Sequence, residues 1–295
     1  MHMKRLQILW LGIACTLLAT GCQTDRKTCP EGTVPTVITV SIEPLRYLAE
    51  QIAGDGYEVN TLVPKGSSPE TYEPTPKQMM DLSESKVCLT VGDLGFERTW
   101  GDKLRQAAPD VPFVRTADGI TRTAGHAHSH KGEAMQEDDP HVWTSPACMK
   151  IIAQNICTAL CKLDTAQAEE FQARLQQALQ TIQATDDSIR TLLGTSSPKA
   201  FLIYHPALTY FAEDYGWTQI SIETDGKEPS PAQLARIIQA CKEKQVRTIF
   251  VQQEFDRKNA ELIAKETGTR IATINPLSYD WTGELLKIAH TLHDQ

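Results

Sequence analysis

Five of the eight histidines in this 295-residue chain lie in surroundings that suggest metal chemistry. Three of them, His126, His128 and His130, alternate with small residues in a segment flanked by glycine. Imidazole nitrogens bind borderline metals such as zinc, so this segment is a candidate auxiliary metal-binding loop. A solvated polar loop without a metal shows the same pattern, and both interpretations stay open at the level of the residues.

The other two histidines, His141 and His205, each lie next to a proline and beside an expected element. His141 follows an Asp-Pro pair at 139–140 and precedes Trp143. His205 follows a β-strand expected over residues 199–204, and side chains at the carboxyl ends of parallel strands line the ligand crevice of open α/β sheets. A histidine at either position could equally be a hydrogen-bonded structural residue, which is the commoner role.

The elements that must position these side chains alternate between strand and helix in two blocks. In the first block we expect strands at 36–41, 57–63, 86–91 and 112–114, and helices at 44–52, 76–83 and 96–107. In the second block we expect strands at 200–204, 218–222, 248–251 and 270–274, and helices at 207–214, 231–244 and 257–267. Alternation of this kind predicts two α/β lobes, each with a mostly parallel sheet covered by helices.

A long amphipathic segment lies between the two blocks and predicts a linking helix over residues 165–194. Its apolar residues recur mainly at spacings of three and four, at Phe171, Leu175, Leu179, Ile182, Ile189 and Leu193. A helix of this length would be a rigid rod of about 45 Å. The predicted domains are therefore an N-terminal lobe at 34–164, which includes the histidine-rich loop at 121–138, and a C-terminal lobe at 195–295.

The first 33 residues carry features of an export and anchoring signal. Two basic residues precede an apolar run at 8–19, which is too short to span a bilayer but suits a secretory signal peptide over 1–21. The run ends at Cys22 in a sequence that resembles a bacterial lipobox. We therefore expect lipidation of Cys22, a tether at 22–33, and an exported protein anchored to a bacterial membrane, periplasmic or at the cell surface. Ordinary cleavage, with Cys22 as a plain thiol, is the alternative.

The charge balance points to a cationic ligand. The chain has 29 Lys and Arg against 37 Asp and Glu, a net charge of −8, and removal of 1–21 would take away Lys4 and Arg5 and no acidic residue. Nucleic-acid binding needs a basic face, so we expect no nucleic-acid partner. An anionic body held near a membrane is suited to collecting cations.

Six motifs in a fixed order carry a family resemblance. They are Gly66–Pro76, Gly92–Glu97, Asp139–Trp143, Tyr204–Pro206, Glu228–Pro231 and Ile274–Leu277. In this order they resemble the metal-binding lipoproteins of ABC transporters, specifically the zinc-uptake branch of the manganese/zinc/iron group. The resemblance implies two α/β lobes bridged by one long helix, with the metal in the cleft between them.

The function that the resemblance implies is zinc transport. We expect a high-affinity extracytoplasmic protein, not an enzyme, that captures Zn²⁺ and delivers it to an ABC transporter permease. Mn²⁺ and Fe²⁺ are less favoured cargoes. We expect the protein to act as a monomer.

The resemblance also assigns four metal ligands: Glu70, His141, His205 and Asn275. His141 and His205 match the family pattern, whereas the family usually has histidine in place of Glu70 and aspartate in place of Asn275. We interpret the two departures as a compensated exchange that keeps one carboxylate but moves it to the N-terminal lobe. Asn275 or a water would then complete tetrahedral zinc. Glu73, three residues after Glu70, is the rival carboxylate or an outer-shell residue.

Two other functions use a similar ligand set. Two histidines and a glutamate also form the catalytic zinc site of several peptidases. Those enzymes usually carry the helical motif His-Glu-x-x-His, which does not occur in this sequence. A surface adhesin or metal sink with the same fold is the second alternative, and nothing within the chain separates it from a transporter component.

Overall fold

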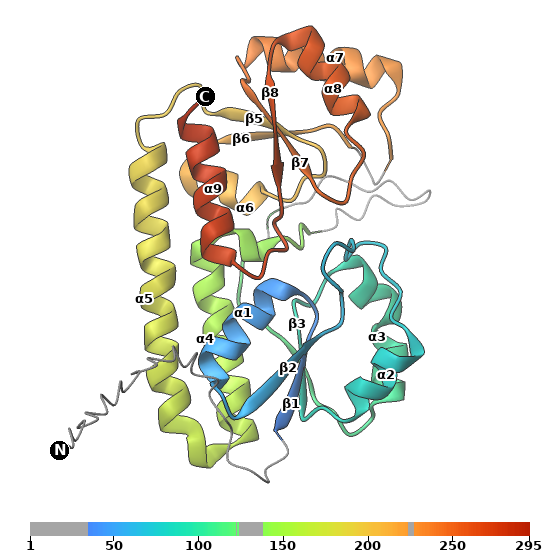
Figure 1. Cartoon of the computed structure of the whole chain (residues 1–295), viewed down its shortest axis with the longest axis vertical. Helices are drawn as coiled ribbons and strands as arrows, with labels where there is room; N and C mark the ends of the chain where they lie inside the picture. Colours follow the sequence, from blue (N-terminus) through green and yellow to red (C-terminus); the bar gives the residue numbers. More distant parts are fainter. Residues whose placement is uncertain (1–34, 122, 124–137, 224–226) are drawn as a thin grey trace, which may run out of the picture. The chain divides into compact units, whose positions relative to one another are not determined.

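Two parallel four-stranded sheets form the framework of the computed structural model, which describes residues 35–121, 123, 138–223 and 227–295 (Figure 1). The N-terminal sheet contains β1 (Thr36–Val40), β2 (Tyr57–Thr61), β3 (Val87–Thr90) and β4 (Phe113–Arg115). The C-terminal sheet contains β5 (Ala200–Ile203), β6 (Thr218–Ser221), β7 (Thr248–Gln252) and β8 (Arg270–Ile274). Their strand orders, β2-β1-β3-β4 and β6-β5-β7-β8, are equivalent, and every neighbouring pair is parallel. The predicted fold class is thereby confirmed.

Helices connect successive strands, as a right-handed parallel crossover requires. The N-terminal lobe has α1 (Glu43–Ala53), α2 (Pro76–Ser83) and α3 (Gly95–Ala107). The C-terminal lobe has α6 (Thr209–Tyr215), α7 (Pro231–Glu243), α8 (Lys258–Thr267) and α9 (Trp281–His293). Helices α2 and α7 begin in the same way, with a proline at the first turn and a capping box in which Thr75 or Ser230 is the N-cap. The expected elements include no counterpart of α9.

Two antiparallel helices join the lobes. A short 3₁₀ turn, η1 (Val142–Thr144), leads into α4 (Pro146–Leu163), and a second turn, η2 (Thr165–Gln167), leads into α5 (Ala168–Leu193). Helix α5 packs against α4, against α1 of the N-terminal lobe and against α9 of the C-terminal lobe (Figure 1). It begins three residues later than the expected linking helix because Asp164 accepts a hydrogen bond from the amide of Ala166 and so caps the 3₁₀ turn.

One apolar core continues from the N-terminal lobe through the linking helices into the C-terminal lobe. Its fully buried side chains include Phe96, Trp143, Phe171, Phe211 and Trp281. Each such side chain stabilises the fold by about 1.5–3 kcal/mol. A smaller, separate core lies beneath α7 and α8. Continuous packing across the linking helices resists large movements of one lobe against the other.

Several sequence-based predictions concern residues that the structure does not describe. These are the signal peptide at 1–21, the lipidated Cys22 with its tether at 22–33, and the auxiliary metal-binding histidines His126, His128 and His130. Within the described part of the chain, no helix has both the length and the apolar character that crossing a bilayer requires.

Candidate metal site

His141 is held in place by an aspartate two residues before it. Oδ1 of Asp139 accepts a hydrogen bond from the His141 amide at 2.8 Å and lies 2.8 Å from Nδ1 of the same residue. The Asp-Pro turn therefore orients the ring before η1 begins and leaves Nε2 as the nitrogen available to a ligand. Carboxylates that accept from the far nitrogen of a metal-binding histidine fix its tautomer and raise its basicity.

His205 is held from the neighbouring strands of its sheet. Strand β5 lies between β6 and β7, so the residues following all three strands meet around His205. Gln252 at the end of β7 donates to the His205 carbonyl at 2.6 Å and accepts from its amide at 3.3 Å. Oε2 of Glu223, just after β6, lies 3.3 Å from Nδ1 of His205. Phe255 stacks on the imidazole with ring centroids 5.4 Å apart.

Glu70 approaches the two histidines from the N-terminal lobe. It lies on the segment between β2 and α2, which is supported by the start of α3, where the amide of Phe96 donates to the carbonyl of Pro69 at 2.9 Å. Gly95 allows this approach, since a Cβ at that position would lie 2.4 Å from the Glu70 carbonyl oxygen. The glycine of the 92–97 motif thus has a steric role in placing Glu70.

Three side chains converge with a geometry that suits zinc. Nε2 of His141 and Nε2 of His205 lie 3.3 Å apart, and Oε1 of Glu70 lies 4.0 Å from Nε2 of His141. One ligand atom from each of the three residues falls within 4.8 Å of the others. A tetrahedral zinc ion with Zn–N distances of about 2.0–2.1 Å would hold its two nitrogens about 3.3 Å apart. The imidazoles are therefore already at coordinating separation, and of these three side chains only Glu70 must move inward.

The electrostatics of the site centre on the pair formed by Asp139 and His141. Burial alone would raise the pKa of Asp139, but the charge and hydrogen bonds of His141 hold that pKa at about 2. Burial alone would lower the pKa of His141, yet the carboxylates of Asp139, Glu70 and Glu223 raise it above the ordinary value. The site attracts positive charge, whether a proton or a metal ion.

The three residues line a cavity of about 320 Å³ that receives residues from both lobes. Half of the buried side-chain atoms without a hydrogen-bond partner in the described chain belong to its lining: Oε1 of Glu70, Nδ1 of His205 and Oε2 of Glu254. Unpartnered buried polar atoms are rare in folded proteins. Their concentration here marks a site built for a ligand.

Asn275, the fourth predicted ligand, and Glu73, the rival carboxylate, both lie outside the lining of this cavity. Asn275 is not among the residues that line the cavity, and its Oδ1 accepts a hydrogen bond from the amide of Leu277 at 3.2 Å. Glu73 is exposed and also lies outside the lining. Of the four proposed ligands and the rival, Glu70, His141 and His205 are brought together, whereas Asn275 caps the turn between β8 and α9.

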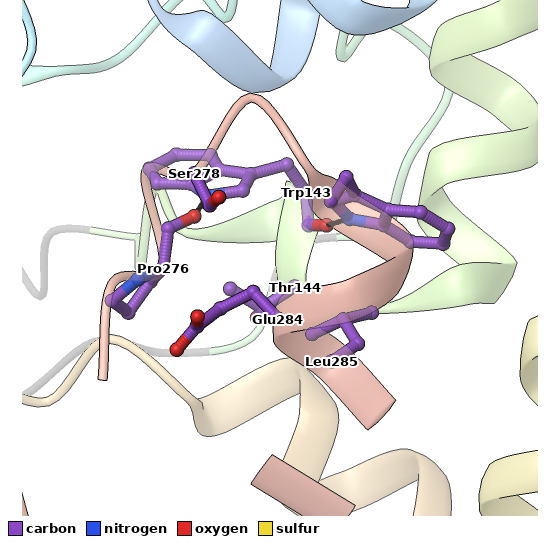
Figure 2. A pocket seen from close by; sticks show the side chains of 7 residues that line it. Trp143, Thr144, Pro276, Ser278, Glu284 and Leu285 are labelled. Carbon is purple, nitrogen blue, oxygen red and sulfur yellow. Dashed lines mark hydrogen bonds between the residues drawn. The ribbon is translucent and has the colours of Figure 1, made fainter. Parts of the chain in front are cut away.

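A smaller cavity of about 180 Å³ shares Trp143 and Pro276 with the first cavity (Figure 2). Figure 2 shows Trp143 and Pro276 at its edge, with Glu284 and Leu285 of α9 opposite. Nε1 of Trp143 donates to the carbonyl of Pro276 at 2.8 Å, and Nε1 of Trp281 donates to the carbonyl of Trp143 at 2.7 Å. This reciprocal tryptophan arrangement ties the His141 segment to the turn between β8 and α9.

Sequence reasoning missed four residues that support or line the site: Asp139, Glu223, Gln252 and Glu254. Asp139 lies in the same motif as His141, but an Asp-Pro pair by itself indicates only a turn. The other three follow or end strands of the parallel sheet that carries His205, where the rule that selected His205 would also have selected them.

Known proteins that are similar to this chain include zinc-uptake and zinc-binding proteins. A sequence profile of the family described as zinc-uptake complex component A, periplasmic (ZnuA), matches residues 38–289. The high-affinity zinc uptake system protein ZnuA of Bacillus subtilis (strain 168) is 27% identical over 285 residues, which cover 91% of this chain and 88% of that protein. A crystal structure of ZnuA has a TM-score of 0.83 and 33% sequence identity, covering 88% of this chain and 99% of that one.

A longer relative is the zinc-binding lipoprotein AdcA of Streptococcus pneumoniae serotype 4 (strain ATCC BAA-334 / TIGR4). It is 26% identical over 287 residues, which are 93% of this chain but 56% of AdcA. The chain therefore spans little more than half the length of that relative, and the remainder of AdcA has no counterpart in the alignment.

Proposed function

Because the chain belongs to the zinc-uptake complex component A (ZnuA) family, we propose that it captures Zn²⁺ outside the cytoplasm and delivers it to an ABC transporter permease. The observation that carries this proposal is the 3.3 Å separation of the two Nε2 atoms, with the Glu70 carboxylate beside them. Two imidazoles and a carboxylate are preferred zinc ligands. The names of the relatives, a zinc uptake protein and a zinc-binding lipoprotein, support the same cargo.

Capture requires that both imidazoles present an unprotonated Nε2 and that zinc loses its water. His141 gives up a proton that Asp139 and Glu70 otherwise favour, so zinc and protons compete for the same nitrogen. The cavity wall replaces the ion's hydration with fixed nitrogen and oxygen atoms. Binding at nanomolar concentration would need about 12 kcal/mol. Such a site releases zinc only when the ligands separate, and we propose that contact with the permease separates them.

We propose that this chemistry ends with binding and includes no catalysis. His141 and His205 come from segments 64 residues apart, one before α4 and one after β5. Zinc peptidases instead usually place two ligands and a general base on one helix. A site assembled from both lobes suits uptake and release better than bond cleavage.

The other parts of the proposal concern attachment and partners. We propose that Cys22 carries lipid, as the name of the lipoprotein relative suggests, and that the histidines at 126, 128 and 130 collect zinc for the main site. The three converging ligands come from a single chain, which supports function as a monomer.

Zinc titration of the mature protein in competition with a chelator tests the binding, and growth under zinc limitation tests the transport. We expect one tight equivalent, and a gene deletion whose growth defect is repaired by the natural protein but not by His141→Ala. Absence of a tight equivalent would contradict the proposed cargo. Tight binding together with normal growth of the deletion strain would favour a metal sink or adhesin.

A further inference from the structure

The cavity around His141 and His205 contains a second carboxylate that the family pattern does not assign. Glu254 follows β7, the strand beside β5, and lines the same cavity as Glu70. Its buried Oε2 atom has no hydrogen-bond partner among the described residues, and the same is true of Oε1 of Glu70. The two lobes thus each offer one unpartnered carboxylate oxygen to the cavity that holds the imidazoles. A buried carboxylate oxygen needs a hydrogen-bond donor or a cation.

Residues before and after Glu254 in the chain both contact His205. Gln252, two residues earlier, makes two hydrogen bonds with the main chain of His205, and Phe255, the next residue, stacks on its ring. The amide of Phe255 donates to the carbonyl of Gln252 at 3.2 Å and closes a tight turn around Glu254. A short, anchored turn places a side chain more reproducibly than a free loop.

The coordination number of zinc gives this carboxylate a role. Two imidazoles and Glu70 would supply three ligands, one fewer than tetrahedral zinc requires. The carboxylates of Asp139 and Glu223 contact the far nitrogens of the two imidazoles, so they cannot be the fourth ligand. Asn275 is a poor candidate, because its amide oxygen already accepts a hydrogen bond from Leu277.

We infer that Glu254 is the fourth zinc ligand, so that the ion is held by His141, His205 and two glutamates, Glu70 and Glu254. Glu254 lies outside the group of ligand atoms within 4.8 Å of one another, so its carboxylate moves inward when zinc binds. The inference rests on the proposed function, since it names a further ligand of the same ion. It replaces the asparagine or water expected from sequence. It also gives the C-terminal lobe two adjacent ligands, His205 and Glu254, at the carboxyl ends of neighbouring strands.

Zinc affinities of single variants provide the first test. Glu254→Gln keeps the shape of the side chain and removes its charge, and should weaken binding at least about tenfold, the lower end of what even an outer-shell substitution causes. Glu266→Gln, on the exposed surface of α8, is the matched control and should bind like the natural protein. Asn275→Asp should leave affinity within about threefold. Thermal unfolding of each metal-free variant shows whether it is folded.

A crystal structure with zinc bound, identified by its anomalous signal, separates a ligand from a merely structural residue. We expect a Glu254 oxygen at about 2.0–2.2 Å from the ion. Natural affinity in Glu254→Gln, or a Glu254 carboxylate beyond bonding distance in the zinc-bound structure, overturns the inference. If His141→Ala also binds zinc as tightly as the natural protein, then the proposed function fails as well. If only Glu254→Gln is unaffected, the proposed function stands and this inference alone is wrong.

Discussion

The two histidines of the site are held in different ways. The His141 side chain is 7% exposed, its Nδ1 has a short contact with Asp139, and the adjoining Trp143 is part of the core that crosses both lobes. The His205 side chain is 15% exposed, and its Nδ1 lies 3.3 Å from Glu223 without a well-aligned hydrogen bond. His141 is thus fixed next to the core that crosses both lobes. His205 is positioned mainly by main-chain hydrogen bonds and by ring stacking at the carboxyl ends of the strands of one sheet.

This difference suggests a division of roles. A ligand whose ring is fixed before metal arrives loses little entropy on binding and supplies affinity. A ligand with a looser outer contact can adjust as the ion enters and leaves. We therefore expect His141 to dominate the affinity of the site and His205 to contribute more to the rate of release.

The largest expected effects come from removing either ring. His141→Ala and His205→Ala should each lower zinc affinity by more than about 100-fold, because loss of a ligand costs more than loss of its outer-shell partner. Competition titration against a chelator measures this loss, and His290→Ala, an exposed histidine on α9, is the control. A variant at 141 or 205 that matched the control would show that its ring does not bind the ion.

Substitution of Asp139 and Glu223, the carboxylates that contact the two imidazoles, tests the difference between His141 and His205. Asp139→Asn should weaken zinc binding about 10–100-fold, because a neutral amide oxygen is a weaker acceptor than the carboxylate that orients His141 and makes it basic. Glu223→Gln should weaken zinc binding about tenfold or less, because the contact between Glu223 and His205 is longer. Calorimetric zinc titration of both variants shows which substitution weakens binding more. A larger loss in Glu223→Gln would reverse the division of roles.

The pH dependence of binding should report mainly on His141. Its raised pKa means that a proton already competes with zinc above pH 6.5, so affinity should fall as pH drops through that raised value. We expect about a tenfold loss per pH unit for each proton displaced. In Asp139→Asn the pKa of His141 should be lower, and the loss should begin at a lower pH. Constant affinity from pH 7.5 to 5.5 would be incompatible with histidine ligands.

The smallest effect should come from the histidine-rich segment. Deletion of residues 125–132 should remove weak additional zinc equivalents and leave the tight site within about twofold, because ordering a glycine-flanked loop costs entropy that rigid ligands do not pay. Thr123 must be kept, since its amide donates to Tyr210 and its carbonyl accepts from the amide of Asp139. Disappearance of the tight equivalent on deletion would place these histidines in the main site.

Much of the fold was predictable because its signals are local. The expected strand at 270–274 and helix at 76–83 match β8 and α2 residue for residue, since side-chain alternation, an N-cap threonine and a proline lie within the segments themselves. Helix α9 was missed. It follows β8 as the alternation of strand and helix predicts, and its buried Leu285, Ile288, Ala289 and Leu292 recur at helical spacing, so the signal was present in the segment itself.

The sequence by itself determined the alternation of strands and helices, and its motifs singled out His141, His205 and Glu70 as candidate metal ligands. These signals depend on residue type and short spacing. Only the tertiary structure decided which other polar groups lie near them, because the strand order that places β5 between β6 and β7 brings Glu223 against His205 and Glu254 into the same cavity. The same is true of Asn275, whose side chain turns to cap its own loop. A ligand's identity can be encoded locally, but its neighbours across the cavity depend on how the whole chain packs.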